Sequence, residues 1–281
     1  MPAVLLALAA TVAWGVADFL GGLTARTTAL RTVLFVSQAT GLLLIGGMVS
    51  ARHTALPGGR FVLFAVVAGP AGTAGLGALF RGMAVGTVSI VAPITATSVI
   101  VPVSVGLLQG ERPRWLQLVG MGLAIAGVVL ASRQIRRDVQ SDRRFTASVG
   151  LALGAALSLG CFLIALNGAG KADPFWAVFL ARGAAVILLG VLLLGRRTHF
   201  SWQGRTVAAL LTIGLLDTTA ITLYAVSSTH GMVSLVSVLA SLYPVITVAL
   251  ARLFLQERAS TSQRAGTVTA LAGIALIAAF Q

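Results

Sequence analysis

The chain has 281 residues, of which 57% are hydrophobic and only 10% are charged. Soluble domains carry about 25% charged residues, so this composition excludes disorder and argues against a soluble enzyme, while a single cysteine, Cys161, excludes a disulfide scaffold. The net charge of +13 does not indicate nucleic-acid binding, because the basic residues fall in short gaps between apolar runs. The composition therefore predicts a membrane protein with several spans.

Ten apolar runs follow one another along the chain. Each approaches the roughly 20 residues that a helix needs to cross a bilayer, and continuous rather than alternating hydrophobicity favours helices over a barrel. The first run contains Asp18 and has no basic start, so we interpret it as a span and not as a cleavable signal peptide. The predicted spans cover residues 3–23, 32–50, 61–80, 87–108, 115–132, 149–168, 174–194, 206–226, 232–255 and 265–280.

The second half of the sequence repeats the first. Residues 86–91 match residues 231–236 at four of six positions, with an offset of 145. Further matches follow in the same order, with a one-residue slip before the later ones: Gly69 with Gly214, Glu111 with Glu257, and Gly120 with Gly266. Each half then holds five spans, and because five is odd, the halves enter the membrane with opposite polarity. Inverted repeats are typical of secondary transporters, although a purely structural membrane protein could also be duplicated.

We therefore divide the chain into a first five-helix repeat, residues 1–137, a basic linker, residues 138–146, and a second five-helix repeat, residues 147–281. The predicted fold is an all-α polytopic membrane protein. Its ten transmembrane helices form two inverted five-helix repeats around a central cavity near the membrane midplane.

Several short motifs carry a resemblance to a known family. They are Ala13-Trp14-Gly15, Ser241-Leu242-Tyr243-Pro244-Val245, and the Glu-Arg pairs Glu111-Arg112 and Glu257-Arg258. Together they resemble EamA-type transporters of the drug/metabolite transporter superfamily, over essentially the whole chain. The resemblance implies ten helices, two repeats, a central substrate cavity and cytoplasmic termini. The first repeat departs from the pattern, since Ser98 stands at the position matched to Pro244.

Charged residues inside the predicted spans are few. Asp18 and Asp217 are the acidic residues well within spans, and Arg182 is the basic residue clearly within one; Arg182 aligns with Gln38 at an offset of 144. A charge at the bilayer centre costs about 2.5–3.5 kcal/mol, so it normally faces a cavity or a partner. We predict a substrate-binding site made of Trp14, Asp18, Gln38, Arg182, Asp217, Thr218 and Tyr243.

Each of these residues has a structural alternative. Arg182 would bind a substrate carboxylate, or it would pair with an aspartate merely to neutralise both charges. An aspartate would bind an amine, carry a proton, or only serve packing. Trp14 would stack on a substrate or pack between helices. The hydroxyl of Thr218 would face the site or bond to its own helix. Tyr243 and Ser241 are two positions apart and are not expected to share a helix face.

Motifs for catalysis, metal binding or nucleotide binding do not occur in the sequence. The histidines lie in separate gaps, and neither an HExxH motif nor a phosphate loop is present. The sequence therefore predicts no enzyme, no catalytic residue, no metal and no cofactor. It predicts a secondary transporter of the plasma (inner) membrane that moves a small organic metabolite or drug by alternating access, through proton coupling or exchange. A non-transporting scaffold or sensor and a channel are the alternatives. The predicted partners are a small-molecule substrate and the lipid bilayer, without nucleic acid, for a monomer or homodimer.

The distribution of positive charge predicts the orientation opposite to the one that the resemblance implies. Gaps after odd-numbered spans hold 13 Arg and Lys residues, and gaps after even-numbered spans hold 5. The positive-inside rule places the odd-numbered gaps in the cytoplasm and both termini outside.

Overall fold

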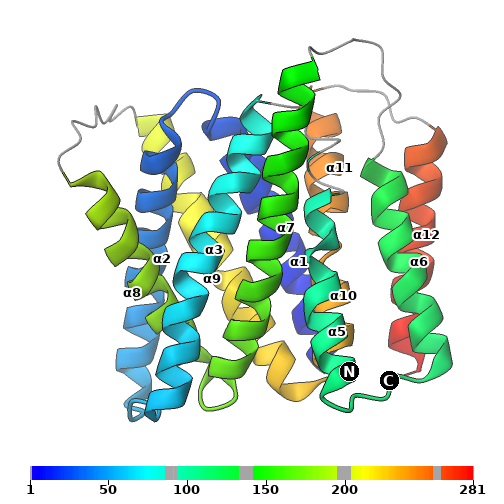
Figure 1. Cartoon of the computed structure of the whole chain (residues 1–281), viewed down its shortest axis with the longest axis horizontal. Coiled ribbons are helices and arrows are strands. Elements are labelled where there is room, and N and C mark those ends of the chain that lie inside the picture. Colours follow the sequence, from blue (N-terminus) through cyan, green and yellow to red (C-terminus); the bar gives the residue numbers. More distant parts are fainter. Residues whose placement is uncertain are drawn as a thin grey trace.

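Apolar segments of this length and composition satisfy their backbone hydrogen bonds internally by forming helices. The computed structural model describes residues 2–85, 91, 94–132, 142–194, 204–255 and 261–280, and these residues contain helices, turns and loops but no strand. Figure 1 shows the helices standing side by side, with the chain passing up and down between two faces.

The helices of the first half follow the predicted spans. They are α1 (Pro2–Thr24), α2 (Leu30–Arg52), α3 (Gly59–Val85), the short 3₁₀ helix η1 (Thr97–Val99) leading into α5 (Ile100–Leu108), and α6 (Trp115–Ser132). Residues 86–90, 92 and 93, where the fourth span was predicted to begin, lie outside the described part of the chain.

The second half repeats this series. Its helices are α7 (Asp142–Gly170), α8 (Pro174–Leu193), α9 (Gly204–His230), α10 (Val233–Ala240), α11 (Tyr243–Leu255) and α12 (Thr261–Ala279). Residues 133–141, which contain the start of the predicted linker 138–146, lie outside the described part, and α7 begins at Asp142.

These elements confirm the predicted all-α polytopic architecture. In the described residues, six helical stretches are long and apolar enough to cross a membrane, namely α1, α2, α3, Thr146–Gly170 of α7, α8 and α9. Four shorter apolar helical stretches supply the other spans, namely Ile94–Leu108, Trp115–Gly127, Val233–Thr247 and Val268–Ile277.

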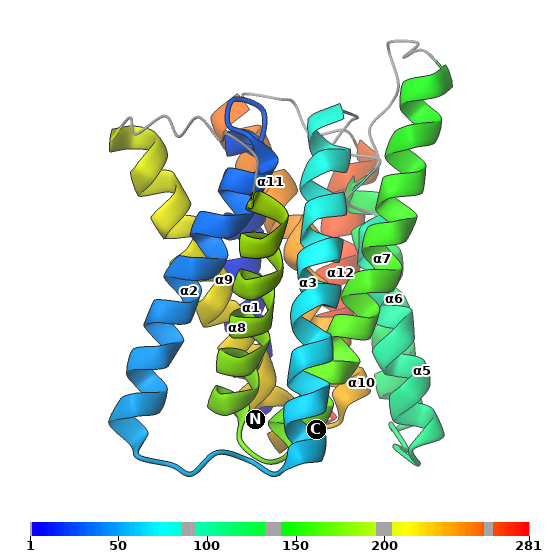
Figure 2. The same ribbon diagram turned by 60° about the vertical axis from the view of Figure 1, so that its left-hand side comes forward.

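The two halves run in opposite directions. In Figure 1, α1 rises from the lower face, where both termini lie, whereas α7 starts at the upper face and descends. Helices of one half pack mainly on helices of the other: α1 contacts α9 and α3 contacts α7, while α2 contacts α9 and α3 contacts α8. Figure 2 shows α3 and α7 side by side. Each contact therefore has a counterpart in the other half.

Glycines make these reciprocal contacts possible. A methyl group at Gly69 of α3 would collide with the backbone carbonyl of Ala181 in α8, and a methyl group at Gly214 of α9 would collide with the carbonyl of Ser37 in α2. Both contacts join positions that the sequence repeat pairs. Small residues let membrane helices approach closely where lipid gives no hydrophobic drive for their association.

The same reciprocity corrects one detail of the predicted repeat. Gly15 lies against the carbonyl of Tyr243, and Gly160 lies against the carbonyl of Ser98. Ser98 therefore corresponds to Tyr243 at an offset of 145, and not to Pro244. The one-residue slip in the repeat therefore lies between Ser98, which has an offset of 145, and Glu111, which has an offset of 146.

The Glu-Arg motif of the first half has a structural role. The carboxylate of Glu111 accepts hydrogen bonds from the backbone N–H groups of Val233 and Ser234, the latter at 3.0 Å, at the start of α10. A carboxylate satisfies free N–H groups and complements the positive end of the helix dipole. Gly110 precedes it with φ +93°, a conformation that favours glycine. Glu257 of the second motif lies outside the described residues.

A second polar contact joins α2 to α8 at the lower face. Asp173 caps α8, accepting from the N–H groups of Phe175 (2.8 Å) and Trp176 (3.0 Å), and it also accepts from Arg52 Nη1 at 2.9 Å. Partial burial opposes ionisation of Asp173, but the hydrogen bonds and charge that it receives outweigh burial and hold the pKa of this carboxyl below its ordinary value.

Replacing Asp173 with alanine is expected to lower the free energy of unfolding by about 1 kcal/mol at neutral pH, the usual effect of losing an N-cap. Because the pKa is lowered in the folded state, this stabilisation is complete above the unfolded pKa of about 3.9 and is lost as the pH falls through the folded pKa. Thermal unfolding of the purified protein between pH 7 and pH 3 measures it. Asp173→Asn, which keeps the cap without the charge, is the control, and an unchanged pH slope in that variant would contradict the assignment.

Candidate functional site

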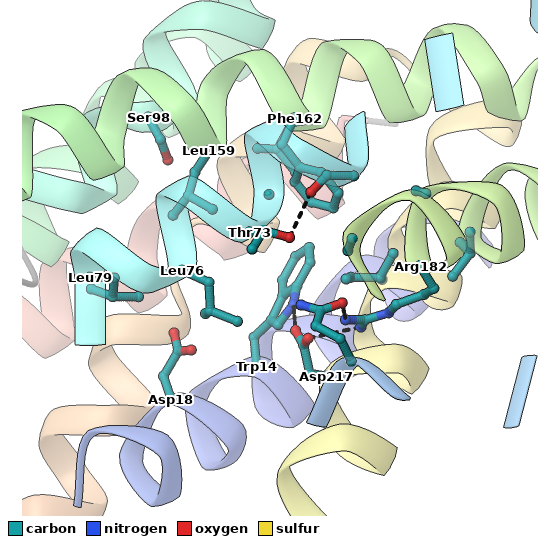
Figure 3. A pocket seen from close by; sticks show the side chains of 18 of the residues that line it. Trp14, Asp18, Thr73, Leu76, Leu79, Ser98, Leu159, Phe162, Arg182 and Asp217 are labelled. Atoms are coloured by element: carbon teal, nitrogen blue, oxygen red, sulfur yellow. Dashed lines mark hydrogen bonds and ion pairs between the residues drawn. The ribbon is translucent and has the colours of Figure 1, made fainter. Parts of the chain in front are cut away.

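A central cavity lies between the two halves. It has a volume of about 80 Å³, and its walls come from α1, α2, α3 and η1 of the first half and from α7–α11 of the second, together with Ser241 in the turn between α10 and α11. Pockets that enclose a drug-sized ligand measure about 300–1,000 Å³, so in this conformation the cavity has room only for a small solute. Figure 3 shows its labelled side chains.

The lining divides into an apolar part and a polar part. Leu76, Leu79, Leu159, Phe162 and Leu163 form much of the apolar wall. The polar lining consists of Trp14, Asp18, Gln38, Thr73, Ser98, Arg182, Asp217, Ser241 and Tyr243. In the described part of the chain, no cluster of histidine, cysteine and acidic residues is suited to a metal ion.

Arg182 is the centre of a buried polar network. Its Nη2 lies 2.8 Å from Asp217 Oδ2, and its Nη1 donates to Gln38 Oε1. Trp14 Nε1 donates to Asp217 Oδ1 at 3.0 Å. Arg182 and Asp217 are only 3% and 6% exposed. The ion pair supports the charge-neutralising interpretation of Arg182 over a guanidinium held open for a substrate carboxylate.

This network joins the two halves. Trp14 lies on α1 and Gln38 on α2 of the first half, whereas Arg182 lies on α8 and Asp217 on α9 of the second. Gly41 of α2 makes the close approach possible, because a methyl group there would collide with Thr218 and approach Arg182. Any movement of one half against the other must carry or rearrange these bonds.

Asp18 stands apart from the network. It lies one helical turn after Trp14 and is 5% exposed, and its carboxylate borders the cavity. Among the described residues it has no hydrogen-bond or ion-pair partner. Figure 3 shows it on the side of Leu76 and Leu79, away from Arg182. The hydroxyl of Tyr243, which also borders the cavity, is likewise without a hydrogen-bond partner in the described residues.

The structure brings six of the seven predicted site residues to one cavity, namely Trp14, Asp18, Gln38, Arg182, Asp217 and Tyr243. Thr218 does not line it. Its side chain lies about 100° around α9 from that of Asp217, and it is buried against Gly41 with no hydrogen-bond partner for its hydroxyl among the described residues.

Ser241 and Tyr243 both line the cavity, contrary to the expectation from helical periodicity. The expectation was wrong because it assumed one continuous helix. Instead α10 ends at Ala240 and α11 begins at Tyr243, with a turn between them. The broken ninth span turns both side chains toward the same space.

The predicted site did not include the apolar wall or three hydroxyl residues of the lining, Thr73, Ser98 and Ser241. The repeat contains the signal that would have found several of them, because residues matched at an offset of 145 line the cavity in pairs: Trp14 with Leu159, Asp18 with Leu163, Asp217 with Gly72, and Tyr243 with Ser98. The positions are thus repeated, but their chemistry is mostly not. In each pair, one half of the chain supplies the polar residue and the other half supplies an apolar or smaller residue.

Comparison with known proteins agrees with this architecture. The model of the EamA-like transporter family matches residues 1–133 and 146–279. One solved crystal structure is similar over 98% of this chain and 95% of that chain, with a TM-score of 0.79 and 16% sequence identity, which shows the same fold. No protein of curated function matches the sequence.

Proposed function

Because the chain belongs to the EamA-like transporter family, we propose that it is a secondary transporter that carries a small organic metabolite or drug by alternating access. The family makes it a membrane transporter of the drug/metabolite transporter superfamily and not an enzyme. The substrate, the mechanism and the location in the plasma (inner) membrane are our proposal. The observation that supports it best is the central cavity between two inverted repeats, with polar groups supplied by both.

The reciprocal interfaces support alternating access. The contact of α3 with α8 and the contact of α2 with α9 are equivalent under the repeat, as the glycine contacts of Gly69 and Gly214 show. If the first half took up the conformation of the second half and the second that of the first, the α3–α8 interface would acquire the geometry of the α2–α9 interface, and the reverse. Two conformations open to opposite faces would then have similar energies, as inverted-repeat carriers require.

The buried ion pair is compatible with such movement. Arg182 and Asp217 neutralise each other, so their network adds no net charge to the cavity. In the proposed mechanism these bonds are carried or rearranged as the helices around the cavity move, and proton coupling or substrate exchange drives the cycle. The proposal includes the division into repeats at residues 1–137 and 147–281, with the basic linker 138–146 between them, in a monomer or homodimer.

Reconstituted liposomes test transport directly. A metabolite panel first identifies a compound that raises the melting temperature, because a ligand bound only to the folded state stabilises it. We expect saturable uptake of that compound, accelerated by the same compound inside the vesicles. Non-saturating conductance would instead indicate a channel, and no flux of any stabilising compound would indicate a scaffold or sensor.

A cavity-filling variant locates the pathway. Gly72 borders the cavity, where an added methyl group would lie 2.9 Å from Phe162. Gly72→Leu is expected to abolish most of the uptake while leaving a folded protein. Gly183→Leu is the matched control, because no atom lies within 4 Å of a methyl group at Gly183, and it should transport normally. Equal uptake by both variants would place the pathway elsewhere.

A further inference from the structure

Among the described residues that line the cavity, the charges do not balance. They are Asp18, Arg182 and Asp217, of which Arg182 and Asp217 form an ion pair. The cavity therefore carries one uncompensated negative charge when Asp18 is ionised. An isolated charge at this depth in a membrane is costly and normally acquires a partner. The described residues supply none, and a ligand that enters the cavity can supply it.

We propose that the transported substrate is an organic monocation whose ammonium group binds Asp18, in competition with a proton. This inference rests on the proposed transport function and specifies its substrate class. The ammonium group and the proton each neutralise the same carboxylate, so only one of them occupies it at a time.

The surroundings of Asp18 suit an amine with an apolar body. Trp14 lies one turn away, and aromatic faces attract organic cations. Leu76 and Leu79 of α3 form the adjoining wall, which Figure 3 shows beside the carboxylate. The free hydroxyl of Tyr243 offers one further polar contact.

Few other titratable groups face Asp18. From α9 it faces Asp217, which is already paired, and from α11 it faces Tyr243. The cavity residues that α3 contributes are Gly69, Gly72, Thr73, Leu76 and Leu79, and α10 and the turn after it contribute Ala240 and Ser241. None of these carries a charge. Among the described lining residues, a single carboxylate, that of Asp18, therefore decides the net charge of the cavity.

Asp217 does not fit this role. One of its oxygens binds Arg182 and the other accepts from Trp14, so both are occupied. An anionic substrate fits no better. It would have to displace Asp217 from Arg182, and it would then add a second uncompensated negative charge beside Asp18.

Exchange follows from this competition. A bound monocation leaves the cavity neutral, and so does a proton on Asp18. Suppose that the protein changes between its two conformations only with a monocation bound or with Asp18 protonated. One monocation then moves in one direction for each proton that moves in the other. No covalent bond forms or breaks apart from the O–H bond of Asp18, whose proton goes to water.

Three probes of nearly the same shape test the charge class in the purified full-length protein. They are small enough for the cavity described above: tert-butylammonium, its neutral isostere tert-butanol, and methanesulfonate, a tetrahedral anion of similar size. We expect only the cation to raise the melting temperature, and its apparent affinity to fall as the pH is lowered. In Asp18→Asn, binding of the cation should weaken roughly ten- to hundredfold and lose its pH dependence, since a charge-assisted contact is removed.

Thr73→Val is the matched control. Thr73 borders the cavity, and its hydroxyl bonds only the Gly69 carbonyl of its own helix in the described structure, so valine keeps the shape and the charge. This variant should bind the cation like the wild type. Wild-type binding that is equal for the three probes, binding of the cation by Asp18→Asn with wild-type affinity, or no binding of the cation at all would each overturn the proposal.

The flux of the same probes into liposomes separates this inference from the transport function. Saturable uptake of methanesulfonate but not of the cation would overturn the charge class and keep transport. Binding of the cation that depends on Asp18, without any saturable flux, would keep the site and overturn transport. Uptake of the cation with release of a proton would support both.

Discussion

Alanine in place of Asp217 is expected to lower the free energy of unfolding by about 3–5 kcal/mol, because it leaves a buried guanidinium without its counter-charge. Arg182 is 3% exposed, and its remaining described side-chain partner is the neutral amide of Gln38. The variant also removes the acceptor of the indole N–H of Trp14. Equilibrium unfolding of the purified protein in detergent measures the loss.

A double-mutant cycle distinguishes loss of the pair from loss of either side chain. Arg182→Met combined with Asp217→Leu should be less destabilised than Asp217→Leu or Arg182→Met alone, since an apolar pair of similar volume often replaces a buried ion pair without cost. If the effects of the single and double replacements simply add, the two residues are not coupled and the network does not exist as described.

Alanine at Gly127 is expected to lower the free energy of unfolding by about 1–3 kcal/mol, the usual cost of overpacking. Gly127 of α6 lies against the backbone of Ala270 and, at 2.7 Å from an added methyl group, the carbonyl of Gly266 in α12. Backbone atoms cannot move aside as a flexible side chain can, so the two helices must separate. Thermal unfolding and cross-linking between α6 and α12 measure the change.

Gly122 provides the control in the same helix. A methyl group there meets no atom within 4 Å, so Gly122→Ala should be neutral or stabilising by up to about 1 kcal/mol. The repeat also predicts that Gly273→Ala behaves like Gly127→Ala, because Gly273 lies against Gly120 and Ala124 in the reciprocal contact. Equal melting of the Gly122 and Gly127 variants would show that α6 and α12 do not pack this closely.

The helices and their repeat could be read from the sequence because the bilayer imposes length and hydrophobicity on every span. The membrane position of Asp18, Arg182 and Asp217 followed from the same constraint. Which aspartate pairs with Arg182 could not be read, because α1 and α9 both bring one toward the cavity and only their packing selects Asp217.

Two further details depended on the conformation of the backbone. The turn between α10 and α11 places Ser241 and Tyr243 on the same cavity, although an unbroken helix would separate them. The rotation of α9 turns Thr218 away although its neighbour Asp217 faces inward. Helical periodicity does not predict the break between α10 and α11, and it separates Thr218 from Asp217 without deciding which of the two faces the cavity.

The unequal lining of a repeated framework has a consequence for how such a protein can acquire new substrates. Leu159 and Leu163 occupy the repeat positions of Trp14 and Asp18 and already border the cavity. The backbone contacts that hold α3 on α8 and α2 on α9 are made by other residues, Gly69 and Gly214 among them. A polar substitution at Leu159 or Leu163 would therefore change what the cavity recognises while those helix contacts stay in place. The duplicated framework therefore contains a second set of cavity positions, at which substitutions can produce a new specificity.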